Sequence, residues 1–202
     1  MKLWKKVLAA VTAGMLCLGC AGVSGLQGVL GSVSAVLPVC AAENDTAYTV
    51  TVPVGTRTTQ LTYTVNADDT VEITDCENDA AGDLEIPAEI DGKTVTSMGY
   101  YSFSYCANLT SVIIPNGVAN IGDNAFGNCE KLENITIPSS VTNIGDRSFA
   151  GCENLTSVII PNSVENIGYS AFDGCTSLAE ITIPSSVTSI GGNAFLDTPW
   201  LA

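Results

Sequence analysis

The cysteines are the residues of this chain whose type and spacing could most directly do chemistry. Four of them recur every 23 residues, at Cys106, Cys129, Cys152 and Cys175. One thiol per repeat gives a line of sulfurs rather than the tetrahedron that a metal site needs. Neighbouring side chains of such a line run parallel, whereas a disulfide needs them to converge. We therefore expect these four to be small buried apolar residues. Cys76 lies outside this line, and we expect it to stay free.

The other chemical side chains do not form a recognisable catalytic set. The chain contains no histidine, so Ser–His and Cys–His pairs are excluded and the most common general base is missing. Asp123 and Asp146 share one repeat position, but Tyr169 and Gly192 follow them there, so calcium binding is a minor alternative. No glycine-rich phosphate loop follows a strand pattern. We predict no enzyme activity, no cofactor and no metal site.

Charge excludes a further class of partner. The chain has 21 acidic and 7 basic residues, for a net charge of −14. Every acidic residue lies after residue 42, with only Arg57, Lys93, Lys131 and Arg147 as basic residues, so 43–202 carries 4 − 21 = −17. Nucleic-acid binding needs a basic surface, and anionic membranes repel so acidic a domain. We expect no nucleic-acid partner.

A 23-residue repeat dictates how these residues are placed. Apolar, glycine and proline positions recur with that period, and a fixed period of this length is typical of a solenoid. The phenylalanine positions are Phe103, Phe126, Phe149, Phe172 and Phe195. The glycine positions are Gly99, Gly122, Gly145, Gly168 and Gly191. Because one repeat cannot bury its apolar side alone, the repeats must stack as coils with continuous internal columns.

Each coil has a predicted order of edges and corners. In the unit beginning at Leu132, Ile135 and Ile137 face one side of a strand and Thr136 the other, and Pro138 ends that strand. A second extended piece covers 141–144. We expect the following glycine to end it by taking a φ that other residues disfavour. One helical or 3₁₀ turn over 146–151 then carries the phenylalanine inward.

The coils and the segments before them divide the chain. We predict a solenoid over 84–202, with a divergent first coil over 84–108 and regular coils over 109–131, 132–154, 155–177 and 178–200. A five-residue insertion around Asp91–Lys93 distinguishes the first coil. Three alternating segments, 48–52, 61–65 and 71–73, predict a small β cap over 43–83, with turns at 53–55 and 66–69. A terminal unit of this kind hides one open end of the core.

The N-terminal segment predicts export. Lys2, Lys5 and Lys6 precede a run without charge from Val7 to Ala42, which is typical of a secretory signal peptide over 1–42. An uncleaved membrane anchor and a lipoprotein acylated at Cys20 are the alternatives. Cys17, Cys20 and Cys40 leave with a cleaved signal. We expect the protein to be secreted or displayed on a cell surface.

The repeat Leu-x-x-Val/Ile-x-Ile-Pro-x-x-Val-x-x-Ile-Gly-x-x-Ala/Ser-Phe-x-x-Cys resembles the BspA-like leucine-rich repeat family of bacterial surface proteins. The lead-in from Leu84 to Val95 also looks like that family's opening repeat, and the resemblance covers roughly 71–202. It implies a leucine-rich repeat solenoid, mainly β and right-handed, with a parallel sheet on one side. It also implies secretion or surface display, often with a role in adhesion or protein binding, and no catalytic residues.

The outward strand positions are the candidate binding face. They form two columns, one of Ser111, Asn134, Ser157 and Glu180, the other of Ile113, Thr136, Ile159 and Thr182. Isoleucine returns every second coil, because 111–116 resembles 157–162 in a 46-residue super-period. The expected partner is a protein or glycan on a host or bacterial surface. Alternatively, the isoleucines merely cover a sheet with β-forming residues, and the chain is a structural or truncated piece. No cap pattern follows the last coil, so end-to-end self-association there is also expected, unless Trp200 acts as a lid.

Overall fold

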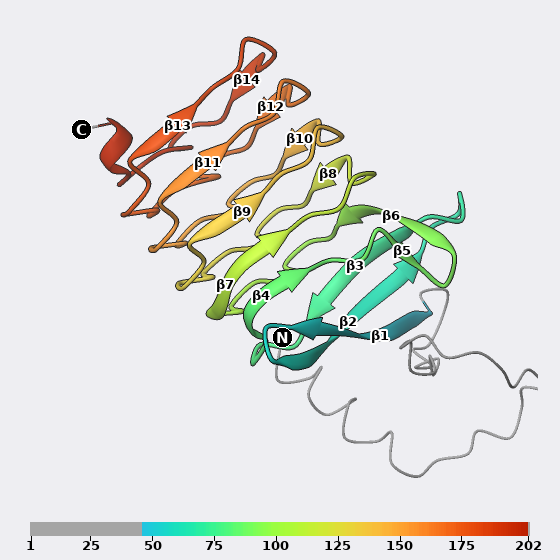
Figure 1. Cartoon of the computed structure of the whole chain (residues 1–202). Helices are drawn as coiled ribbons and strands as arrows, with labels where there is room; N and C mark the ends of the chain where they lie inside the picture. The colour runs from blue at the N-terminus through green and yellow to red at the C-terminus, as the bar shows by residue number, and fades with distance from the viewer. Residues whose placement is uncertain (1–45, 202) are drawn as a thin grey trace, which may run out of the picture. The chain divides into compact units, whose positions relative to one another are not determined.

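Residues 46–201 of the computed structural model form a β solenoid of stacked coils (Figure 1). This confirms the predicted fold class. The predicted signal segment 1–42, with Cys17, Cys20 and Cys40, lies outside the described residues. Within 46–201, no helix is long and apolar enough to cross a membrane.

One edge of every coil is a strand that carries the candidate face. These strands run parallel, each 23 residues after the one before it in the regular coils: Ser111 is opposite Asn134, and Ser157 is opposite Glu180. Strand β4 of the first coil pairs with β7 in the same sense, while β11 and β13 form a separate two-stranded ladder. The strands of this edge are β4 (Ala81–Glu85), β7 (Asn108–Ile113), β9 (Asn134–Thr136), β11 (Ser157–Ile159) and β13 (Glu180–Thr182).

The second edge is a parallel ladder of its own, so the strands are not confined to one side. Its strands after β6 have two residues each and end at the repeat's isoleucine. Asn143 is paired with Asn120 on one side and Asn166 on the other. The strands are β6 (Lys93–Met98), β8 (Asn120–Ile121), β10 (Asn143–Ile144), β12 (Asn166–Ile167) and β14 (Ser189–Ile190).

The third edge differs from the predicted helical or 3₁₀ turn. Over 146–151 the chain makes successive β-turns, with the Ser148 N–H donating to Gly145 O and the Ala150 N–H to Arg147 O. Between those bonds, the Phe149 N–H donates 2.8 Å to Ala171 O of the next coil. The turns are therefore hydrogen-bonded from coil to coil, which a helix would prevent by using the same donors internally. The 3₁₀ helix of the described chain, η1 (Pro199–Leu201), lies at the end of the last coil.

The predicted reason for the glycine column was wrong. None of these five glycines has a positive φ. These positions are glycine because the preceding coil leaves no room for a Cβ atom. A Cβ on Gly145 would lie 2.8 Å from Asp123 N, and one on Gly122 would lie 2.6 Å from Met98 O. Two residues later the chain does enter the left-handed region, with non-glycine residues at φ of 52–59°. They are Tyr101, Asn124, Arg147, Ser170 and Asn193.

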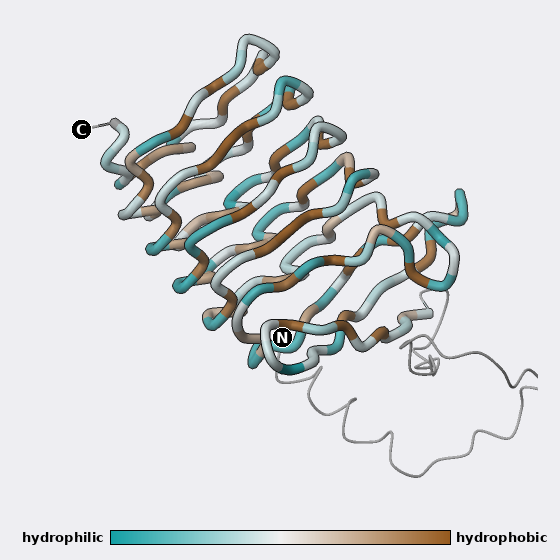
Figure 2. Tube along the Cα trace, in the orientation of Figure 1, coloured by the Kyte–Doolittle hydropathy of each residue, from teal (hydrophilic) through white to brown (hydrophobic). Residues whose placement is uncertain are grey.

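The core is a set of columns that run through the coils. The phenylalanine rings are buried and stack with centroids 4.9–5.5 Å apart, nearly parallel from one coil to the next. The cysteine column beside them is buried, and none of the five described cysteines forms a disulfide. Apolar residues recur at matching places of successive coils in Figure 2. Coil stacking therefore places like over like, as the period predicts.

The N-terminal strands join the two ladders across the end of the core. β1 (Ala47–Val54), β2 (Arg57–Val65) and β3 (Val71–Cys76) are antiparallel; β1 also pairs with β4 and β3 with β6. The turn predicted at 53–55 begins later in the chain than expected, because Pro53 still belongs to β1. The insertion is a hairpin of β5 (Glu89–Ile90) with β6, tied down by a 2.6 Å hydrogen bond from Tyr63 Oη to Asp91 Oδ2.

Candidate functional site

The two predicted columns lie side by side on the strand edge of the coils. Strand alternation turns Val112, Ile135, Val158 and Ile181 into the core and their neighbours outward. The register adds Asp83 to the column that starts at Ser111, and Glu85 to the column that starts at Ile113. Seven of the eight predicted residues are exposed and Ser111 is half-buried. They are Ser111, Asn134, Ser157 and Glu180, with Ile113, Thr136, Ile159 and Thr182. Whether this face binds a ligand stays a prediction.

The isoleucines differ in how far they are open to solvent. Ile159 is 82% exposed and Ile113 is 43% exposed. Ile113 lies between paired strands, with Glu85 and Thr136 beside it. Ile159 is paired with Thr182 only on its far side, because β11 begins the separate ladder. The two therefore stand two coils apart, roughly 10 Å at the usual strand spacing, with a threonine between them.

A shallow depression of about 620 Å³ adjoins the N-terminal end of the face. Ile113 and Thr136 contribute to it, and so do residues that the sequence did not mark. Val52 and Pro53 come from β1 of the cap, and Pro87 from the first coil. Sequence reasoning missed them because the cap departs from the repeat, so no register relates β1 to the coil strands. The depression joins apolar side chains of three segments that are distant in sequence.

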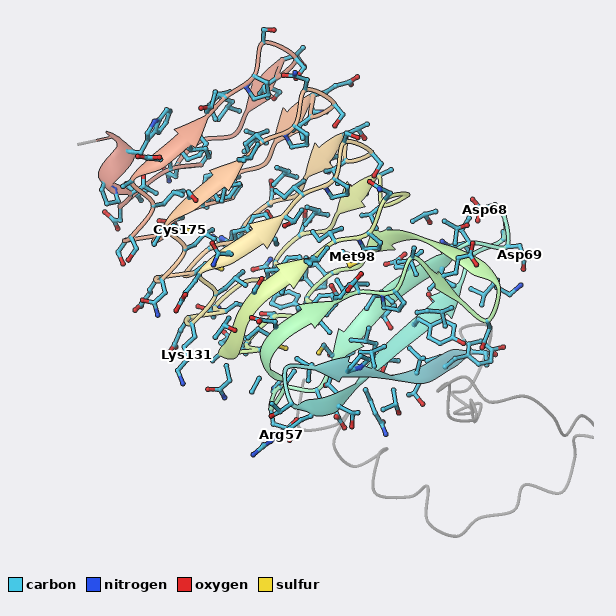
Figure 3. All side chains as sticks on the ribbon, in the orientation of Figure 1. Arg57, Asp68, Asp69, Met98, Lys131 and Cys175 are labelled. Carbon is cyan, nitrogen blue, oxygen red and sulfur yellow. The ribbon has the colours of Figure 1, made fainter. Side chains whose placement is uncertain are left out.

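The charged side chains in the two columns of the face are all acidic. Asp83 and Glu85 stand at one end of the columns and Glu180 near the other, and neither column contains a lysine or arginine. The Thr110 hydroxyl donates a 2.8 Å hydrogen bond to Asp83. Lys131 lies at the rim, donating to Asn108 Oδ1 at 2.9 Å, and it points away from the coils, as does Arg57 of the cap (Figure 3). The face is apolar in the middle and acidic at its ends.

Asp123 and Asp146, which share one repeat position, accept hydrogen bonds from backbone N–H groups of the next coil. Asp123 Oδ1 accepts the Asp146 N–H at 2.9 Å, and Asp146 Oδ1 accepts the Tyr169 N–H at 2.7 Å. A second shallow depression, about 420 Å³, borders these residues. The guanidinium of Arg147 lies over the Tyr169 ring, 5.7 Å from its centroid. Among residues 46–201, no cluster of three or more potential metal ligands occurs.

Two thiols of the cysteine column, those of Cys152 and Cys175, are unreactive for a physical reason. Burial raises the pKa of the Cys152 thiol well above its ordinary value, and burial raises that of Cys175 to about 12. A thiol must ionise to attack an electrophile or bind a metal, so these two are poor nucleophiles in the folded chain. The sequence placed Cys76 outside the column, but in the structure its thiol lies beside that of Cys106.

Comparison with known proteins gives the family. The profile of the BspA type leucine rich repeat region matches residues 86–202 in six copies. The chain belongs to this leucine-rich repeat family. No curated protein matches the chain significantly.

Solved structures of bacterial leucine-rich repeat proteins share the fold. A leucine-rich repeat protein of T. pallidum is 32% identical, with a TM-score of 0.64 over 67% of this chain and 63% of that one. A leucine-rich cell surface protein of Faecalibacterium prausnitzii is 34% identical (TM-score 0.63; 68% of this chain, 35% of that one). One from Bacteroides ovatus is 40% identical (TM-score 0.61; 67% and 37%). The repeat chain thus spans about a third to two thirds of these relatives.

Proposed function

We propose that this repeat protein is exported and binds a protein or glycan on a host or bacterial surface through its outward strand face. The observation that carries the proposal is the exposure of Ile159 and Ile113, two apolar side chains in one outward column. The coils between and beyond them place Thr136 and Thr182 at the same position, so a β-forming residue need not be apolar there. Repeated exposed apolar groups on a solenoid face favour a contact surface.

The chemistry of the face indicates the character of its partner. Apolar contacts lie in the middle, at Ile113 and Ile159, and acidic groups lie at Glu85 and Glu180. A complementary protein surface has apolar side chains flanked by lysine or arginine, because opposite charges at the rim orient the encounter. The face is continuous over several coils rather than enclosed, which suits an extended macromolecular surface better than a small molecule.

Export is supported by two independent observations. The basic start and the uncharged run up to Ala42 are typical of a secretory signal. One similar solved protein is described as a leucine-rich cell surface protein. The lack of disulfides within the cysteine column does not contradict export, because neighbouring side chains of a stacked column run parallel rather than converge.

Substitution of both isoleucines tests the face. Ile113→Asp with Ile159→Asp in the full chain should abolish retention of whichever purified matrix protein or glycan the wild type binds in an array. The matched control, Asn120→Asp with Asn166→Asp, adds the same charge on exposed positions of β8 and β12 and should bind as the wild type does. Unchanged urea unfolding of both variants would show that they fold. A folded double-isoleucine variant that still binds would exclude this face.

A second candidate role is a structural piece without a ligand of its own. Ile190 is 49% exposed and Leu196 45% exposed in the last described coil, which favours stacking against further coils or another copy. Sedimentation of the purified chain distinguishes the two roles. A monodisperse monomer supports an independent binding module, and concentration-dependent oligomers support the structural role.

A further inference from the structure

Three thiols of the cysteine column share one arrangement. Each lies 3.2 Å from the phenylalanine carbonyl oxygen of the preceding coil and donates to it: Cys129 to Phe103, Cys152 to Phe126, and Cys175 to Phe149. Each sulfur is therefore directed at a backbone oxygen, not at the sulfur of the next coil.

Cys106, the first member of the column, is different. Its own coil is the first one, so the β cap rather than a repeat precedes it, and its thiol is directed at Glu77 O, 3.6 Å away. The Cys76 thiol lies 3.6 Å from the same oxygen. Cys76 and Cys106 are 2% and 0% exposed. Two buried thiols, one from the end of β3 and one from the turns after β6, thus converge on a single acceptor.

A carbonyl oxygen shared by two weak donors holds both sulfurs close to one another. The contact with Cys106, followed by burial, raises the pKa of the Cys76 thiol above its ordinary value. In the reduced protein the pair is therefore two neutral thiols in contact inside the core.

We propose that Cys76 and Cys106 form a disulfide when the chain folds under oxidising conditions, while Cys129, Cys152 and Cys175 stay reduced. Two S–H bonds break and one S–S bond forms. The two protons and two electrons pass to a disulfide oxidant, such as oxidised glutathione or a dithiol oxidase, which is reduced to two thiols. Because both cysteines are buried in the folded protein, the exchange takes place before the cap closes over the first coil.

The bond would fasten the cap to the solenoid. It closes a loop of 106 − 76 = 30 residues that contains β4, β5 and β6, the strands through which the cap meets the first coil. A cross-link across a loop restricts the unfolded chain. The end of the core that the cap covers would then open only together with the coils beneath it.

A tryptic map under non-reducing conditions tests the proposal. Cleavage after Arg57, Lys93 and Lys131 places Cys76 in peptide 58–93 and Cys106 with Cys129 in peptide 94–131. After refolding of the full chain with oxidised glutathione and alkylation of free thiols, we expect a cross-linked 58–93/94–131 pair that separates on reduction. Fragment ions should place the bond at Cys106 and the alkyl group at Cys129.

Two variants complete the test. Cys129→Ala should keep the cross-linked pair and Cys106→Ala should lose it, and oxidation should raise the urea midpoint of the wild type but not of Cys106→Ala. Fully alkylated Cys76 and Cys106 in the oxidised wild type would overturn the proposal, as would a bond assigned to Cys129. Because the oxidant is added to purified protein, the result does not depend on export or on ligand binding.

Discussion

Two positions of each coil, two residues apart, are subject to different steric constraints. At Gly145 the backbone has an ordinary φ, but the preceding coil leaves no room for a Cβ. At Arg147, two residues later, φ is 52° and the side chain is free to point outward. A left-handed residue with a side chain costs about 1–2 kcal/mol, which stacked turns can tolerate, whereas an overlap with backbone atoms forces the coils apart.

Substituting these glycines should separate the two effects. Gly145→Ala should lower the free energy of unfolding by about 1–3 kcal/mol or more, because the added carbon must displace the preceding coil. Gly92 has a φ of 74° and open space around its Cβ position, so Gly92→Ala should cost only about 1 kcal/mol. Urea unfolding followed by circular dichroism measures both. A Gly145→Ala variant as stable as the wild type would contradict the steric explanation of the column glycines.

At the scale of the element, the period predicted contacts better than it predicted backbone shape. Phe149 and Cys152 could be assigned to internal columns because a fixed 23-residue spacing forces like residues to stack. The turn over 146–151 could not be assigned, since its hydrogen bonds to the next coil depend on a register that no local sequence signal specifies. Pro53 shows the same limit, because whether a strand tolerates proline depends on its neighbours.

The buried thiols make the solenoid sensitive to alkali. Unfolded thiols ionise near their ordinary pKa of 9.0, but Cys175 ionises at about 12 and Cys152 well above 9.0 in the folded chain. Below pH 9 these thiols are neutral in both states and their contribution is complete. As the pH rises from about 9 towards 12, only the unfolded chain loses the protons, so stability falls by up to about 1.4 kcal/mol per pH unit for each thiol.

Urea midpoints at pH 7.5, 9.0 and 10.5 measure this loss. Cys152→Ala with Cys175→Ala should be less stable at pH 7.5, because it leaves space in the column, but its midpoint should fall less steeply with pH. Parallel pH profiles for wild type and variant would show that the thiols do not carry the effect.

At the scale of the whole molecule, the outward strand columns were more predictable from the sequence than the depression beside them. The outward columns follow from strand alternation, so Thr136 and Ile159 could be placed from the sequence alone. The depression beside Ile113 could not, because Val52 and Pro53 reach it from the cap by long-range pairing. The exposed fraction of each isoleucine could not be predicted from the sequence either, since it depends on the separate pairing of β11 with β13.

If the chain has the structural role, the second candidate above, the apolar side chains exposed on the last described coil should drive self-association. Ile190, Leu196 and Trp200 are exposed there, although the Trp200 ring covers part of Phe195 at 5.0 Å between centroids. Burying a large apolar side chain contributes about 1.5–3 kcal/mol, so Ile190→Lys with Leu196→Lys should weaken association more than tenfold. Analytical ultracentrifugation over a range of concentrations measures this. Ile159→Lys, on the strand face, should associate as the wild type does; if it alone abolished association, the copies would meet through the strand face instead of coil end to coil end.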